Sequence, residues 1–145
     1  MNARMDWVAL VLLLAGCRQQ PANTAAQSGR DIYLARCAVC HGVDREGIPG
    51  MYPPLKGAEW VDGPPKRMAA IILDGIQARV GKMDAIMPAG ATVMNDAEIA
   101  SVMTWLRAAD GKPPVTPVEV EHVRIVTAAR NTFWTMDDLR NIPIP

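Results

Sequence analysis

The sequence predicts an all-α fold, because three of its segments combine apolar residues at helical intervals with residues that cap helices. In residues 95–109, Asn95 can cap the helix and Glu98 stands at the third position of its first turn. Residues 64–74 have Pro near their start and Gly just past their end. Residues 116–129 begin with Thr-Pro-Val-Glu, a second capping box with Pro at the first helical position. Extended strands are not indicated anywhere, so short helices form the expected core.

The composition fits one ordinary globular domain of 145 residues, with 50% hydrophobic and 21% charged residues. Fifteen basic residues balance fifteen acidic ones, and a neutral chain lacks the basic surface that nucleic-acid binding needs. Aromatic residues make up only 5% of the chain, whereas Met occurs nine times. A core with so few rings could be completed by a group that the chain does not encode, such as a large flat cofactor.

The N-terminus predicts export. Residues 7–14 form an apolar run that is much shorter than the roughly 20 apolar residues needed to span a bilayer, so residues 1–16 are interpreted as a signal peptide. Leu-Ala-Gly before Cys17 resembles the lipobox of bacterial lipoproteins, and this resemblance implies cleavage before Cys17 and lipid attachment to it. Residues 17–28 are polar and small, as expected for a flexible tether. The alternative is an ordinary signal peptide with an incidental Cys.

Cys37, Cys40 and His41 form a Cys-x-x-Cys-His motif, the attachment signature of c-type haem. The two intervening residues let both sulfurs reach vinyl groups on one porphyrin edge, and the adjacent His then lies under the iron as a ligand. A disulfide or thioredoxin-like redox pair and half of a zinc site are the alternatives. Zinc would need four ligands, and the only other His is His122. A thioredoxin-like site would need an α/β pattern, which is absent.

Residues 28–110, which surround this motif, resemble a single-haem class I cytochrome c. In that family, a Gly and an aromatic residue four positions later let the first helix cross the last helix closely. Gly29 and Tyr33 match this pair, and Trp105 matches the aromatic residue of the family's last helix. The resemblance implies a cytochrome c fold of three to four short helices around one covalently attached haem c.

The segment 53–57 (PPLKG) resembles the family's Pro-x-Leu-x-Gly segment. The resemblance implies that the Pro53 carbonyl accepts a hydrogen bond from His41, which fixes the tautomer of the ring and raises its basicity. It also implies that Leu55 packs on the haem. For Trp60 two interpretations stay open: its indole N–H points at a haem propionate, or the ring simply packs in the core.

Met87 is the expected sixth ligand of the iron, because it lies in the sequence IMPAG before the last core helix, as the family's distal Met does. A thioether in this position raises the haem potential relative to a second His. Relatives often carry a second Pro and an aromatic residue where this chain has Ala and Gly, so the loop is expected to be looser. Met83 and Met94 flank the loop as rival ligands. His122 would give a bis-His site, but it is interpreted as a solvated helix residue beyond the core.

The predicted organisation continues after the cytochrome c domain (29–110) with a helical C-terminal extension (111–145) that covers the core. Its first helix is expected to run from 117 to about 129, with Val123 and Val126 buried. A second, weaker cap follows at residues 135–138, and Trp134 is the expected anchor. Similar tails occur on some bacterial cytochromes that associate with periplasmic dehydrogenases.

The resemblance implies one-electron transfer by a periplasmic cytochrome that is tethered to a bacterial membrane, inner or outer. An iron saturated by His41 and Met87 has no open position for substrate. The expected partners are a protein electron donor and acceptor, such as a dehydrogenase, a reductase or a terminal oxidase. Two alternatives stay open: a cytochrome subunit of a larger dehydrogenase or reductase, and a haem enzyme or gas-binding protein with a labile sixth ligand. No carboxylate pair, Ser–His arrangement or phosphate loop suggests catalysis by this chain alone.

Overall fold

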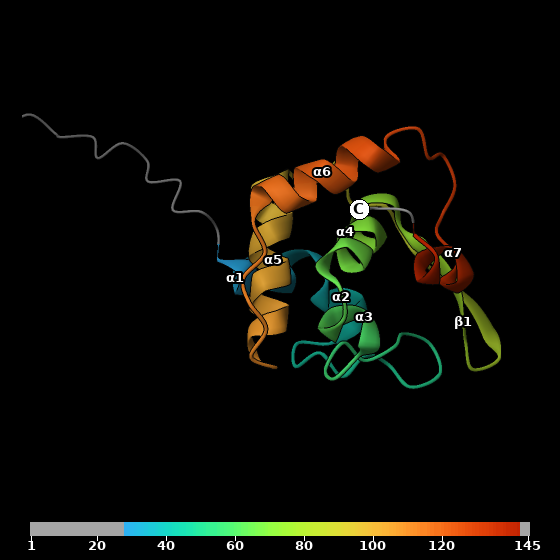
Figure 1. Cartoon of the computed structure of the whole chain (residues 1–145). Coiled ribbons are helices and arrows are strands. Elements are labelled where there is room, and N and C mark those ends of the chain that lie inside the picture. Colours follow the sequence, from blue (N-terminus) through green and yellow to red (C-terminus); the bar gives the residue numbers. More distant parts are fainter. Residues whose placement is uncertain (1–27, 143–145) are drawn as a thin grey trace, which may run out of the picture.

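Helices dominate the computed structural model, which describes residues 28–142 (Figure 1). The helices are, in chain order, α1 (Gly29–Arg36), α2 (Ala38–His41), α3 (Glu59–Asp62), α4 (Pro65–Asp74), α5 (Asp96–Ala108), α6 (Pro117–Thr127) and α7 (Met136–Arg140). The strands β1 (Ile76–Val80) and β2 (Met83–Met87) form an antiparallel hairpin. The predicted helical fold class is confirmed. The predicted signal peptide, Cys17 and the predicted tether up to residue 27 lie outside the described residues.

Helices α1 and α5 cross in close contact, because Gly29 has no side chain at the crossing. A Cβ atom at Gly29 would overlap the Ser101 carbonyl oxygen and lie 2.7 Å from the Trp105 Cβ. One turn along α1, the Tyr33 ring packs on the Trp105 ring with centroids 4.9 Å apart. The Tyr33 hydroxyl also donates to the Gly42 carbonyl at 2.6 Å. The close crossing that Gly29 and Tyr33 predict is therefore confirmed.

The core lies where α4 meets α5 and α6. Helix α4 begins at Pro65 and ends before Gly75, as predicted, and most of its residues are buried. Helix α5 begins with the predicted capping box between Asn95 and Glu98. Near its end, the buried Arg107 donates to the carbonyls of Val61 and Gly63. These two bonds tie the last core helix to the end of α3.

The hairpin is a correction, because no strands were expected. In β1 the apolar residues are half-buried and alternate with two exposed polar residues. Gly81 opens the two-residue turn with a φ of 60°, as a type II′ turn prefers. The register pairs Ile76 with Met87, so Met87 ends a strand, whereas a loop position was predicted. An isolated two-stranded hairpin is at best marginally stable in water, and here a parallel bridge joins Ile76 to Trp134.

The predicted helical extension packs on the core, with α6 lying across α5 and α4 (Figure 1). Its capping box begins at Thr116, as predicted. Helix α6 buries Val120, Val123 and Thr127, which share one face because they lie three and four residues apart. The predicted burial of Val126 is wrong: its position falls on another face of α6, and it is 45% exposed. None of the helices between residues 28 and 142 has the length and apolarity required to cross a membrane.

Trp134 anchors the far end of the extension, as predicted, and is 6% exposed. Its backbone N–H donates to the Gly75 carbonyl, and its indole N–H donates to an Asp74 carboxylate oxygen at 3.0 Å. The Arg130 guanidinium lies 3.6 Å from the ring centroid on the ring face. The extension is thus fixed to the turn between α4 and β1.

Candidate functional site

The cysteine motif forms the joint between the first two helices. Cys37 ends α1 and begins α2, which is only four residues long. The N–H groups of Cys40 and His41 both donate to the Cys37 carbonyl, at 3.2 and 3.0 Å. One helical turn therefore separates the two cysteines and puts their sulfur atoms on the same side of the chain. Both cysteines are free, and Gly42 ends the turn with a φ of 75°.

His41 is held as a neutral ring with a defined tautomer. Its Nδ1 lies 3.1 Å from the Pro53 carbonyl oxygen, which can only accept, so Nδ1 carries the proton and Nε2 keeps its lone pair. Burial lowers the pKa of His41 and outweighs the hydrogen bond to Pro53, which raises it. The expected hydrogen bond between His41 and Pro53 is confirmed. The ring thus has the form that ligates a metal through Nε2.

The loop that carries Pro53 depends on Gly47 and on Arg45, a residue that the sequence did not indicate. A Cβ at Gly47 would come within 2.7 Å of the Pro53 carbonyl, so only Gly allows this close approach. Arg45 has a φ of 70°, and its carbonyl accepts from the N–H groups of Leu55 and Lys56. Its guanidinium lies over the Trp105 ring at 5.1 Å and donates to α5. The loop is thereby fixed on the last core helix.

Two apolar cavities, of about 420 and 390 Å³, lie beside His41. The larger cavity is also lined by Cys37 and Leu55, and the smaller one by Pro53. Six residues line both cavities: Cys40, His41, Trp60, Ile71, Met87 and Pro88. The structure therefore brings every cofactor-binding residue predicted within residues 28–142 to one pair of adjoining cavities.

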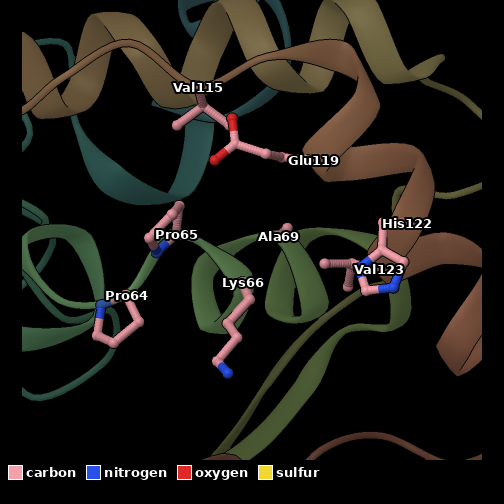
Figure 2. Close-up of a pocket in the computed structure, with 8 residues that line it drawn as sticks. All are labelled: Pro64, Pro65, Lys66, Ala69, Val115, Glu119, His122 and Val123. Carbon is pink, nitrogen blue, oxygen red and sulfur yellow. The ribbon is translucent and has the colours of Figure 1, made fainter. Parts of the chain in front are cut away.

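The rival ligands lie in three different settings. Met94 lines the larger cavity together with Met87. Met83 is 47% exposed at the start of β2 and lines neither cavity. His122 is exposed on α6 and lines a separate pocket of about 280 Å³ between α4 and α6, to which neither cysteine contributes (Figure 2). The interpretation of His122 as a solvated helix residue is confirmed.

The protonation of Cys37 bears on the redox-pair alternative. Burial raises the pKa of the Cys37 thiol to about 11, with a smaller increase from Cys40 and a decrease from Arg36. Redox-active cysteines instead have lowered pKa values, because the thiolate is the reactive form. Both thiols also line the larger cavity, and a disulfide between them would need no such cavity. The structure thus favours a large cofactor over a dithiol switch.

The residues around the cavities fit a covalently attached haem. Two free thiols stand one helical turn apart, a neutral imidazole has its Nε2 available, and the adjoining space is lined by apolar side chains. A helical domain with such a Cys-x-x-Cys-His site defines the class of c-type cytochromes.

Comparison with known proteins agrees with this class. A family model described as "Cytochrome C oxidase, cbb3-type, subunit III" matches residues 24–106, and the chain belongs to this family of c-type cytochromes. A cytochrome c-552 of Thermus thermophilus is 33% identical over 128 residues, which cover 78% of this chain and 82% of the relative. Covalently bound haem c and electron transfer follow from this membership.

Two further relatives are named as subunits of dehydrogenases. The cytochrome c subunit of the quinone alcohol dehydrogenase of Gluconacetobacter polyoxogenes is 31% identical over 109 residues, or 70% of this chain and 23% of the relative. The gluconate 2-dehydrogenase cytochrome c subunit of Pantoea cypripedii is 31% identical over 110 residues, or 68% and 24%. The chain thus spans about a quarter of the length of these two relatives.

Proposed function

We propose that this chain is a one-electron carrier outside the cytoplasm, with a single haem c attached to Cys37 and Cys40 and ligated by His41 and Met87. The observation that carries the proposal is that His41 and Met87 line the same two cavities beside the cysteines. Haem c, when bound, supplies an iron that alternates between the ferric and ferrous states. With His41 and Met87 both bound to the iron, the haem would offer no open position to a substrate, so the chain would exchange electrons and would not itself turn over a substrate.

The surrounding residues orient and shield the ligands. The Pro53 carbonyl holds the His41 ring and increases its basicity through Nδ1. Leu55 and Trp60 line the larger cavity and exclude water from it. A thioether ligand favours the ferrous state, so Met87 would give a higher potential than a second His would.

Replacement of Met87 tests the ligand assignment. Ferric low-spin haem with a Met ligand has a weak absorption at the red edge of the visible spectrum. Wild type should show this band, and Met87→Ala should lose it and bind carbon monoxide readily in the reduced state, because the sixth position is then open. The midpoint potential should fall if a nitrogen donor replaces the sulfur. Absorption spectra, carbon monoxide binding and redox titration measure these effects.

Two other Met variants serve as controls. Met83→Ala should retain the band, because Met83 is exposed and lines neither cavity. Met94→Ala should also retain it, although Met94 lines the larger cavity. Haem staining after denaturing electrophoresis shows that each variant is loaded. A band that survives in Met87→Ala assigns the ligand to another residue, and rapid carbon monoxide binding by wild type would favour a gas-binding protein or haem enzyme.

A membrane anchor at Cys17 completes the proposal. Its support is the sequence Leu-Ala-Gly-Cys behind a short apolar run. Two or more acyl chains hold a protein on a membrane far more firmly than a single acyl chain does. The carrier would then move electrons between redox proteins at that membrane.

The second candidate function is that of a cytochrome subunit in a periplasmic dehydrogenase complex. The observation that favours it is the similarity to the alcohol and gluconate dehydrogenase cytochrome subunits. In this case the substrate chemistry belongs to a partner chain, and the present chain accepts its electrons. A haem protein that migrates with a dehydrogenase after detergent extraction would favour this candidate over a free carrier.

A further inference from the structure

Arg124 joins the C-terminal extension to the segment between β2 and α5. Its Nε donates to an Asp96 carboxylate oxygen at 2.8 Å, and its two terminal nitrogens donate to the carbonyls of Ala91 at 2.8 Å and Met94 at 3.0 Å. Its side chain is 29% exposed and that of Asp96 27% exposed. All three nitrogens of one guanidinium are thus used within the short stretch 91–96.

The same segment is also hydrogen-bonded to the C-terminal end of α4. The N–H groups of Gly90 and Ala91 donate to the carbonyls of Ile72 and Leu73, at 2.8 and 3.1 Å. A Cβ at Gly90 would lie 2.8 Å from the Ile72 carbonyl oxygen, so a residue without a side chain is needed for the segment to lie this close to α4. The Ala91 peptide groups are therefore bonded to α4 through the N–H and to Arg124 through the carbonyl.

We propose that Arg124 is a positioning residue for Met87, the proposed sixth ligand of the haem iron. It fixes the backbone that follows Met87 and keeps Met94, which lines the same cavity only seven residues later, in the cavity wall. This inference rests on the proposed function, because it takes Met87 as the ligand. Without Arg124 the carbonyls of Ala91 and Met94 lose their donor, the segment 88–96 gains freedom, and the hold on Met87 weakens.

The expected size of the effect follows from the type of bond. Charge-assisted hydrogen bonds to a half-buried guanidinium are stronger than neutral ones, and the three bonds here act on one short segment. Loss of this clamp should accelerate local opening of the segment by about tenfold. Opening exposes the sixth position, so carbon monoxide should bind the ferrous protein faster by a similar factor.

Arg124→Met is the test variant, because it keeps an unbranched apolar stem and removes all three donor nitrogens. Arg140→Met is the matched control: Arg140 also lies in the C-terminal extension, and its exposed guanidinium donates to Asp137 at 2.9 Å, a residue of α7 and not of the segment 91–96. Asp96→Asn removes the ion pair but leaves both carbonyl acceptors, and its effect should be smaller than that of Arg124→Met. Arg124→Lys, which keeps the charge, serves if Arg124→Met does not fold.

Three measurements on the full holoprotein decide the proposal: amide hydrogen exchange at Ala91 and Met94, carbon monoxide binding, and the red-edge absorption of the ferric form. Arg124→Met should show exchange and carbon monoxide binding about tenfold faster, with a weaker band, while Arg140→Met stays within about twofold of wild type. Arg124→Lys should fall between wild type and Arg124→Met.

Wild-type exchange rates in Arg124→Met, or in Arg124→Lys if only that variant folds, would overturn the proposal. Equal acceleration in Arg140→Met would overturn it too, because the effect would then come from general loosening of the extension. If wild type itself binds carbon monoxide rapidly, the proposed function fails. Hydrogen exchange then tests the role of Arg124 separately. Faster exchange in the Arg124 variant alone supports that role, and unchanged exchange refutes it.

Discussion

Single residues with local signals are the part of this molecule that the sequence predicts best. Cys37, Cys40 and His41 follow each other in a motif whose spacing already matches one helical turn, and Pro53 lies in a short segment that resembles the family. By contrast, Arg45 and Arg124 have no such signal, because their side-chain partners lie 61 and 28 residues away in the chain. Arginines are common on protein surfaces, and only the folded chain shows which carbonyls their side chains contact.

Gly29 gives a direct test of packing at the residue scale. Gly29→Ala should destabilise the fold by about 1–3 kcal/mol through overpacking, although Ala has the better helix propensity. The reason is that the added Cβ would overlap a backbone oxygen of α5, which cannot rotate away as a side chain would. Chemical unfolding of the holoprotein measures the change.

Arg30→Ala is the matched control for Gly29→Ala. Arg30 is the exposed neighbour of Gly29 on α1, so its replacement should change the free energy of unfolding by no more than about 0.5 kcal/mol. A stability of Gly29→Ala equal to that of wild type would contradict the close crossing of α1 and α5.

At the scale of elements, helices with caps were predictable and the hairpin was not. The predicted boundaries of α4, α5 and α6 agree with the structure within two residues, because Pro, Gly and capping boxes mark their ends. Strand β1 does alternate exposed and half-buried residues, and Gly81 follows it, but five residues are a weak signal. In β2 the exposed positions include the apolar residues Met83 and Ile86, so the sequence of this strand does not alternate between polar and apolar residues. Trp134, over 40 residues further on, supplies the contact that supports the hairpin.

The capping boxes predict how the extension responds to pH. Hydrogen bonds from Thr116 lower the pKa of Glu119, and hydrogen bonds from Thr135 lower that of Asp138. A carboxyl whose pKa is lower in the folded state stabilises that state above its unfolded pKa, and this contribution disappears as the pH falls through the folded pKa. We therefore expect α6 and α7 to loosen in the acid range below about pH 4, before the core unfolds.

Amide hydrogen exchange in α6 and α7, followed as the pH is lowered, measures this loosening after correction for the intrinsic exchange rates. The variants Glu119→Gln and Asp138→Asn carry no titrating group at the caps, so the pH dependence of protection in their helices should flatten. The prediction fails if protection in wild type stays constant down to the pH at which the core unfolds.

The whole molecule combines a short cytochrome core with an extension that reaches both ends of the segment between α4 and α5. Arg124 binds the end of this segment near α5, and Trp134 binds its beginning at Gly75. The sequence predicted the extension and its anchor, because caps and a lone Trp are visible in it. It did not indicate that the extension contacts both the segment after Met87 and the start of β1, since these are tertiary contacts.

A second property of the whole molecule is its expected attachment to a membrane. Wild type should partition into the detergent phase, and Cys17→Ser should give a soluble or unprocessed protein, because the lipid is expected on that thiol alone. Phase separation followed by haem staining measures the distribution. Wild type that enters the aqueous phase with its mature terminus intact would refute the anchor.

The bridge between β1 and residue 134 has a consequence for solubility. A two-stranded hairpin has two outer edges, and each edge with free N–H and C=O groups is a template for pairing with another chain. Here the Gln77 N–H donates to the Trp134 carbonyl at 2.8 Å, so the end of β1 nearest the core is occupied from within the molecule. A chain shortened before Trp134 would expose that stretch of β1 to other protein molecules. Within residues 28–142, β1 and β2 are the only strands, so the extension covers part of the edge through which self-association would occur.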